Sequence, residues 1–169
     1  STNPIAIGDN VLVDLQTNGH SFIYDICDRK NYIVRKSSNL SKHSHIIGAN
    51  IDQAILVVTV NYPETSTGFI DRFLVSADAY HVPVIIVFNK VDLYIENERN
   101  YLDALKQLYQ HIGYRCIETS VVSMQGIEEL KECLRGNISL FSGNSGVGKS
   151  SLIHQIDPTL DVKIGLISE

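Results

Sequence analysis

The spacing of apolar residues changes along the chain near residue 50. Before residue 37 they come in short runs, separated by polar turns such as Asn18-Gly19 and residues 28–31. Short runs bounded by such turns are typical of β-hairpins. We therefore predict a small β unit over residues 1–37, with strands at Val11–Val13, Ser21–Ile26 and Tyr32–Val34. The polar stretch 37–45 that follows is typical of a linker.

From residue 50 onward, continuous apolar runs alternate with segments of helical spacing. The runs Ala54–Val60 and Val84–Phe88 are rich in β-branched residues, which is typical of strands buried on both faces of a sheet. Shorter strands are predicted at 116–118 and 138–141, and helices at 69–80, 101–112, 127–134 and from 149 onward. This alternation predicts a parallel sheet with helices on both faces. The expected division is 1–37 for the β domain, 38–49 for a linker and 50–169 for the α/β domain.

A glycine-rich motif lies between the last predicted strand and the last predicted helix. It reads Gly143-Asn144-Ser145-Gly146-Val147-Gly148-Lys149-Ser150 and matches G-x-x-x-x-G-K-S in full. In such a loop the backbone N–H groups and the helix N-terminus face phosphate oxygens. We expect Lys149 to reach the β- and γ-phosphates and the Ser150 hydroxyl to bind Mg²⁺. Asn144 and Ser145 fill the loop, and Ser151 either faces the α-phosphate or is a helix-surface serine.

A second motif, Asn89-Lys90-Val91-Asp92, directly follows the predicted strand Val84–Phe88. Guanine presents two donors side by side, and a carboxylate such as Asp92 accepts both. Adenine has no such pair, so Asp92 argues against an ATPase. Lys90 would lay its aliphatic stem over the base, and Asn89 would brace the neighbouring loops. Taken alone, the tetrapeptide could also be a turn with a solvated charge pair.

A third candidate element is Thr119-Ser120-Val121, after the strand predicted at 116–118. GTPases usually have Ser-Ala here, and the backbone amide after the serine binds the guanine carbonyl. Val121 stands in place of that alanine, but a backbone contact survives a change of side chain. The alternative for Ser120 and Val121 is an ordinary turn from strand to loop.

Composition narrows the function classes. The net charge of −5 excludes a globally basic nucleic-acid binder. The three cysteines lie far apart in or beside apolar runs, so we expect buried reduced thiols. The apolar runs are too short to span a membrane, and the N-terminus lacks a signal-peptide pattern. A cytoplasmic, monomeric protein without membrane contact is the expectation. The chain begins without methionine and ends soon after a motif, which favours a fragment.

The order of the motifs is informative. Ras-like GTPases have the phosphate loop first and the base-reading motifs last, whereas this chain has them in the reverse order. Ligands of parallel α/β sheets bind beyond the carboxyl ends of the strands, so the site survives a permutation of the termini at surface loops. The motifs, together with Ile46–Gln53, Asn61–Arg72 and Gly143–Leu152, resemble those of ribosome small-subunit-dependent GTPase A, the bacterial family of circularly permuted GTPases. The resemblance runs along essentially the whole chain.

The resemblance implies an N-terminal OB barrel, a circularly permuted Ras-like P-loop GTPase domain and a C-terminal zinc domain. The activity that the resemblance implies is GTP hydrolysis stimulated by the 30S ribosomal subunit during late subunit maturation. It implies Mg²⁺ with GTP or GDP as the bound ligands. Residues 1–37 resemble the later strands of the barrel, a fold that binds RNA through basic grooves and stacking aromatics. Candidate contacts to rRNA are Arg29, Lys30, Arg35 and Lys36 around Phe22, Tyr24 and Tyr32. The alternative is solvated edge charges and core aromatics.

Two elements of a complete GTPase are missing. No glycine is preceded three positions earlier by aspartate, so the D-x-x-G loop is absent, and no switch threonine is identified. In the permuted order both belong beyond residue 169, as does the zinc domain. We therefore identify no catalytic residue and expect these 169 residues to bind nucleotide with little or no hydrolysis. A permuted GTPase of another lineage, acting on a different RNA or protein, and a non-hydrolysing guanine-nucleotide module remain alternatives.

Overall fold

A four-stranded parallel sheet forms the centre of the molecule. In this computed structural model, which describes residues 5–16, 20–36 and 44–160, the strand order is β7-β6-β5-β8. The strands are β5 Gln53–Val58, β6 Val84–Asn89, β7 Arg115–Thr119 and β8 Ser139–Ser142. All three pairings are parallel, with Ile55 opposite both Ile85 and Phe141. The carboxyl ends of the strands therefore meet at one edge of the sheet.

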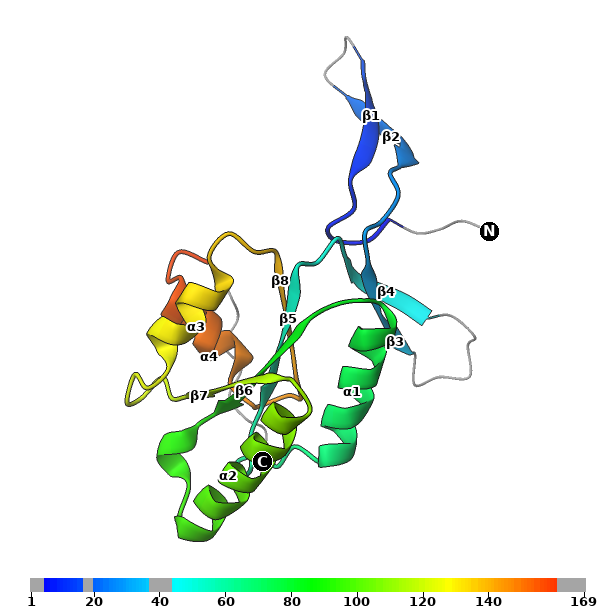
Figure 1. Cartoon of the computed structure of the whole chain (residues 1–169). Coiled ribbons are helices and arrows are strands. Elements are labelled where there is room, and N and C mark those ends of the chain that lie inside the picture. The colour runs from blue at the N-terminus through cyan, green and yellow to red at the C-terminus, as the bar shows by residue number, and fades with distance from the viewer. Residues whose placement is uncertain (1–4, 17–19, 37–43, 161–169) are drawn as a thin grey trace.

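Helices cover both faces of this sheet, as the sequence predicts. Helices α1 Thr67–Ala79 and α2 Glu96–His111 pack on one face, and α3 Ile127–Leu134 and α4 Lys149–Ile156 on the other (Figure 1). Successive residues of β5 alternate between the two cores, with Leu56 in the first and Val57 in the second. That alternation explains the continuous apolar runs, because a strand buried on both faces has no polar side.

Two helices begin earlier than their apolar spacing predicts. Helix α2 begins at Glu96, five residues before the expected start, because its first turn is polar. Glu98 accepts a hydrogen bond from the backbone N–H of Ile95 (3.0 Å), which satisfies an amide at the helix start. Helix α1 begins at Thr67 after Ser66, whose hydroxyl accepts from the Phe69 N–H (3.3 Å). Side-chain caps thus extend both helices beyond their apolar stripes.

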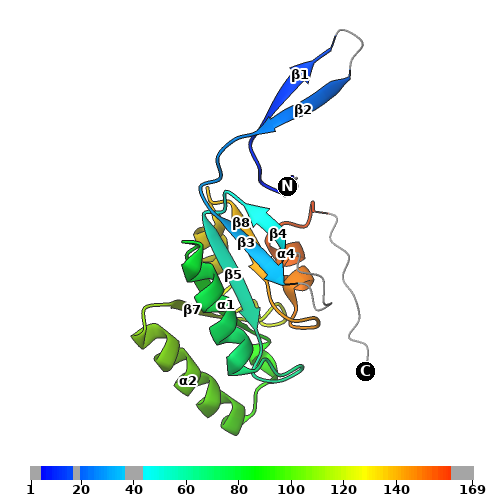
Figure 2. The same ribbon diagram turned by 90° about the vertical axis from the view of Figure 1, so that its right-hand side faces the viewer.

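The N-terminal strands form two antiparallel pairs. Strands β1 Val11–Leu15 and β2 Ser21–Ile26 make a hairpin that projects from the body of the molecule (Figures 1 and 2). Strand β3 Tyr32–Lys36 pairs with β4 Ser44–Ala49 beside α1. Ile33 belongs to the core under α1, and the ring centroids of Tyr32 and Tyr80 lie 4.6 Å apart. These strands fit a partial OB-fold domain joined to the sheet by apolar packing.

Strand β4 corrects the expected linker over residues 38–49. Residues 44–49 pair with β3, and Gly48 and Ala49 at the end of β4 are buried. The polar start of this strand conceals it in the sequence, because pairing with β3 supplies its stability. Residues 38–43 lie outside the described part of the chain, and the division into domains stays a prediction.

One cysteine also departs from expectation. Cys27 is exposed, whereas Cys116 is buried and Cys133 is half-buried. Cys27 directly follows β2 on the projecting hairpin, where Phe22, Ile23 and Tyr24 are exposed and Ile26 is only half-buried. Within the described residues, no helix has the length and apolar character needed to cross a membrane.

Candidate nucleotide site

Three loops converge at the carboxyl edge of the sheet. The base-reading motif follows β6, the serine turn follows β7, and the glycine-rich loop follows β8. Asn89 and Thr119 are opposite each other in the β6–β7 register. Because the strands are parallel, motifs separated by more than 50 residues in the sequence come together at this edge.

Asn89 ties the three loops to one another. Its side-chain Nδ2 donates to the backbone carbonyl of Val147 in the glycine-rich loop (2.9 Å). Its Oδ1 accepts from the hydroxyl of Thr119, next to the serine turn (2.9 Å). Asn89 is 1% exposed and Thr119 is fully buried, so both bonds lie away from water. This is the bracing that the sequence assigns to Asn89, and it places the two principal motifs side by side.

The glycine-rich loop approaches its neighbours too closely for side chains at two positions. At Gly148 a Cβ atom would lie 2.4 Å from Asn89 Nδ2, and the backbone φ is +95°. At Gly143 a Cβ atom would lie 2.2 Å from the carbonyl oxygen of Val57, at φ +146°. Both the left-handed backbone and the close contacts require glycine. The Val147 side chain is buried in the core between the sheet and helices α3 and α4, and this burial anchors the loop.

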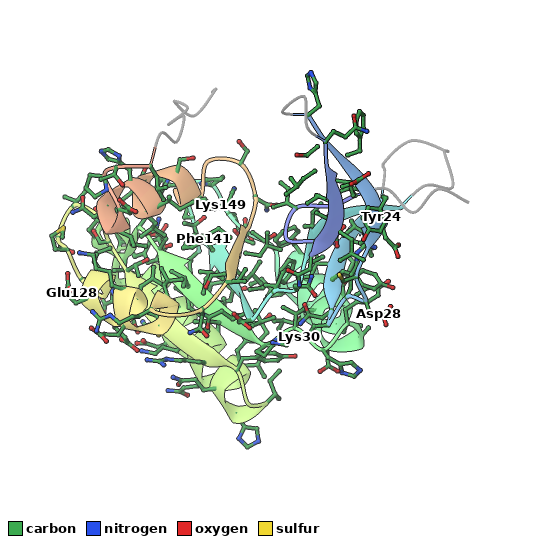
Figure 3. All side chains as sticks on the ribbon, turned by 90° about the horizontal axis from the view of Figure 1, so that it is seen from above. Tyr24, Asp28, Lys30, Glu128, Phe141 and Lys149 are labelled. Carbon is green, nitrogen blue, oxygen red and sulfur yellow. The ribbon has the colours of Figure 1, made fainter. Side chains whose placement is uncertain are left out.

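Lys149 begins α4 at the end of this loop (Figure 3). Its ammonium group donates to the carbonyl oxygens of Gly143 (2.9 Å) and Asn144 (2.6 Å). Burial lowers the pKa of Lys149, because a partly desolvated ammonium loses hydration. An anion beside the ammonium group would compensate for the lost hydration. Ser150 and Ser151 follow in the first turn of α4 and are half-buried.

The base-reading motif ends in a short 3-10 helix, η1 Val91–Leu93. The Val91 side chain is buried in the core, whereas Asp92 is exposed. Lys90 has a left-handed backbone, and its Nζ donates to the carbonyl oxygen of Tyr62 (2.5 Å). Burial lowers the pKa of Lys90, and the nearby charge of Asp92 opposes that shift. The motif is therefore held in place by the buried Val91 and by the hydrogen bond of Lys90, while the carboxylate of Asp92 is exposed.

Tyr94 is a supporting residue that the motif patterns do not indicate. Its hydroxyl donates to the carbonyl of Asn89 (2.6 Å) and accepts from the N–H of Val60 (2.9 Å). Burial raises the pKa of Tyr94 to about 12, so it remains a neutral phenol at physiological pH. Tyr94 thus joins the end of β6 to the loop after β5. Nothing in the local sequence distinguishes it from other core tyrosines.

The serine turn is closed by its own hydrogen bonds. The Ser120 hydroxyl accepts from the N–H groups of Val122 and Ser123 (both 3.1 Å). The Ser120 N–H donates to the carbonyl of Gln125 (3.1 Å). The side chain of Val121 is half-buried and packs with the core under α3 and α4. Valine at this position therefore fills apolar space within the turn.

One candidate RNA contact, Arg29, is paired within the chain. The guanidinium of Arg29 forms a two-point ion pair with Asp9, at 2.6 and 2.8 Å, and the two side chains are only 9% and 1% exposed. The hydrogen bond from Arg29 lowers the pKa of Asp9. Arg29 therefore makes a structural contact within the chain, through Nε and one terminal nitrogen, to Asp9, which is distant in sequence.

The other members of that set differ from one another. Lys30 is 65% exposed and pairs with Asp52 (2.9 Å). Arg35 and Lys36 lie on β3, but their side chains are outside the described part of the structure. Phe22 and Tyr24 are exposed on the hairpin. Tyr24 lies away from Lys149 (Figure 3). Tyr32 is half-buried, and its ring packs against that of Tyr80.

Replacing Asn89 by alanine tests the link between the loops. We expect N89A to lower the free energy of unfolding by about 1–3 kcal/mol, because it leaves the Val147 carbonyl and the Thr119 hydroxyl without this partner. Urea unfolding measures the change, and the exposed α2 residue Asn97→Ala serves as the control. Equal stabilities of N89A and N97A would contradict the bracing role.

The sheet, the helices and the two convergent motifs define a P-loop α/β domain with its motifs in circularly permuted order. A family model described as RsgA GTPase matches residues 26–169. The chain belongs to the RsgA GTPase family.

Relatives with known names are close in sequence. Small ribosomal subunit biogenesis GTPase RsgA 2 of Bacteroides thetaiotaomicron is 62% identical over 168 residues, which cover 99% of this chain and 54% of that protein. Small ribosomal subunit biogenesis GTPase RsgA of Bacteroides fragilis is 60% identical, with the same coverage of 99% and 54%. The chain thus spans about half the length of these curated relatives.

Solved structures agree with the fold. YjeQ from Thermotoga maritima superposes with a TM-score of 0.77 at 41% identity, covering 95% of this chain and 54% of that one. YloQ, a circularly permuted GTPase, superposes with a TM-score of 0.67 at 28% identity, covering 94% and 52%. The predicted permuted GTPase fold is confirmed.

Proposed function

We propose that this chain binds GTP and GDP together with Mg²⁺. The observation that carries the proposal is the Asn89–Val147 hydrogen bond of 2.9 Å, which fixes the base-reading motif against the glycine-rich loop. A guanosine nucleotide has its base and its phosphates at opposite ends, so it needs two such elements close together. Their contact supports one nucleotide spanning both.

Each end of the site has the appropriate chemistry. Backbone N–H groups of the glycine-rich loop and the Lys149 ammonium would bind the phosphates. The Ser150 hydroxyl fits Mg²⁺, which takes hard oxygen donors alongside phosphate oxygens and water. At the other end, the Asp92 carboxylate would accept the two guanine donors and the Lys90 stem would cover the ring. The Val121 N–H would meet the guanine carbonyl.

For the longer protein we propose GTP hydrolysis in assembly of the small ribosomal subunit. The names of the relatives from both Bacteroides species support this proposal. The exposed Phe22 and Tyr24 support contact with single-stranded rRNA, because bases stack on exposed aromatic rings. Phosphate release by the full-length protein, measured with and without 30S subunits, tests it. Absence of GTP hydrolysis would favour a non-hydrolysing guanine-nucleotide module, and hydrolysis without stimulation would favour a different RNA or protein partner.

Nucleotide titration of this chain tests the binding proposal. We expect GDP and GTP with Mg²⁺ to bind roughly 10³-fold or more tightly than ATP, because adenine leaves a carboxylate built for two donors unpaired. Isothermal titration calorimetry measures the ratio directly. Equal affinities for GTP and ATP, or no binding of either, would contradict a guanine site.

A further inference from the structure

A carboxylate at the end of β7 links several elements around the base-reading motif. Glu118 precedes the Thr119–Val121 turn, and its side chain is 17% exposed. It accepts from Lys106 Nζ (2.7 Å), from Arg99 Nη1 (3.5 Å) and from Gln125 Nε2 (3.3 Å). Two cations from α2 thus balance a half-buried charge, and the hydrogen bond to Glu118 raises the pKa of Lys106.

Arg99 extends this cluster to the base-reading motif. While Nη1 faces Glu118, Nη2 donates to the backbone carbonyl of Val91. Val91 immediately precedes Asp92, so its carbonyl belongs to the peptide group that leads into the reading residue. The planar guanidinium can make both contacts at once, which a lysine ammonium does less well.

Asp92, the residue expected to contact the guanine base, needs support from the surrounding structure. Asp92 is exposed on a three-residue 3-10 helix, and such a short helix is held mainly by its surroundings. The Val91 side chain is buried in the core, and Arg99 donates to the Val91 carbonyl, so both contacts hold the η1 backbone. The same Glu118 carboxylate also holds Gln125, whose carbonyl accepts from Ser120 N–H. One cluster therefore supports both loops expected to contact the base.

We propose that Arg99 is a positioning residue for guanine specificity. Through the Val91 carbonyl and Glu118, it holds the Asp92 carboxylate where both oxygens face the N1–H and the 2-amino group of guanine. The inference rests on the proposed nucleotide site. Two parallel hydrogen bonds require a fixed orientation of the carboxylate, whereas a single bond tolerates rotation. Loss of Arg99 therefore weakens discrimination more than it weakens binding in general.

The test compares GDP with IDP, whose hypoxanthine base lacks the 2-amino group. In the unaltered chain, GDP should bind about tenfold more tightly than IDP, as expected for one charge-assisted hydrogen bond. In Arg99→Ala we expect GDP affinity to fall about tenfold and IDP affinity to fall about threefold or less, so that the GDP-to-IDP ratio drops at least threefold. Titration calorimetry gives both affinities, and thermal unfolding checks that the variant is folded.

Arg115→Ala is the matched control. It removes an arginine–glutamate pair of 2.9 Å with Glu129, an exposed pair that leaves the Val91 carbonyl untouched, and should leave the ratio unchanged. Glu118→Gln keeps the shape but removes the charge that orients Arg99, so its ratio should also fall. If R99A does not fold, the GDP-to-IDP ratio of E118Q tests the proposal instead. A GDP-to-IDP ratio equal to that of the unaltered chain in R99A, or in E118Q if R99A does not fold, would overturn the proposal. Failure of the unaltered chain to bind GDP would instead refute the nucleotide site itself.

Discussion

Replacing Asp92 by asparagine is expected to transfer the nucleotide preference from guanine to xanthine. Xanthine keeps N1–H but carries an oxygen in place of the 2-amino group. The asparagine side chain offers one acceptor and one donor, which match that edge. We expect GDP affinity to fall about 100-fold or more, because guanine loses two charge-assisted hydrogen bonds and its 2-amino group meets a donor. XDP affinity should rise by a similar factor, because the xanthine oxygen no longer faces a carboxylate and accepts from the asparagine NH2.

Titration of D92N with GDP, XDP and ADP measures this change. Asp92 is exposed and asparagine has nearly the same shape, so the fold should be retained. Asp103→Asn, an exposed acid on α2, is the control and should leave all three affinities unchanged. If D92N bound GDP as tightly as the unaltered chain, Asp92 would not be the base reader.

Replacing Lys149 by alanine should remove most of the phosphate binding. The ammonium is partly desolvated beside the glycine-rich loop, where an interaction with phosphate is weakly screened by water. We expect GDP and GTP affinities to fall about 100-fold, corresponding to roughly 3 kcal/mol for two charged hydrogen bonds. GMP lacks the β-phosphate, so its affinity should change little.

The comparison of GMP with GDP therefore separates a phosphate role from a structural one. K149A also loses the bonds to the Gly143 and Asn144 carbonyls. If those bonds were its whole contribution, GMP and GDP would weaken together. Lys131→Ala is the control, because Lys131 pairs with Glu128 on the surface of α3, away from the loop. Equal losses for GMP and GDP would contradict the assigned role.

The α/β half of the molecule was largely predictable because its patterns are local. Strands buried on both faces show continuous β-branched runs, and the predicted bounds of α3, Ile127–Leu134, are those observed. Strand β4 was not predictable, because its polar first residues depend on pairing with β3 for stability. The ion pair of Arg29 was not predictable for a similar reason. Its partner Asp9 lies 20 residues away, and the sequence does not indicate that the two side chains meet.

The sequence by itself determined the chemical groups of the proposed site and their order. The G-x-x-x-x-G-K-S loop and Asn89–Asp92 are local motifs, whose residue types follow from backbone curvature and hydrogen-bonding capacity. Only the tertiary structure decided how these groups are held. The Asn89–Val147 bond, the Tyr94 bridge and the Arg99–Glu118 cluster join residues from different strands, helices and loops. Such contacts depend on strand order and register, which arise from packing of the whole sheet and leave no local pattern in the chain.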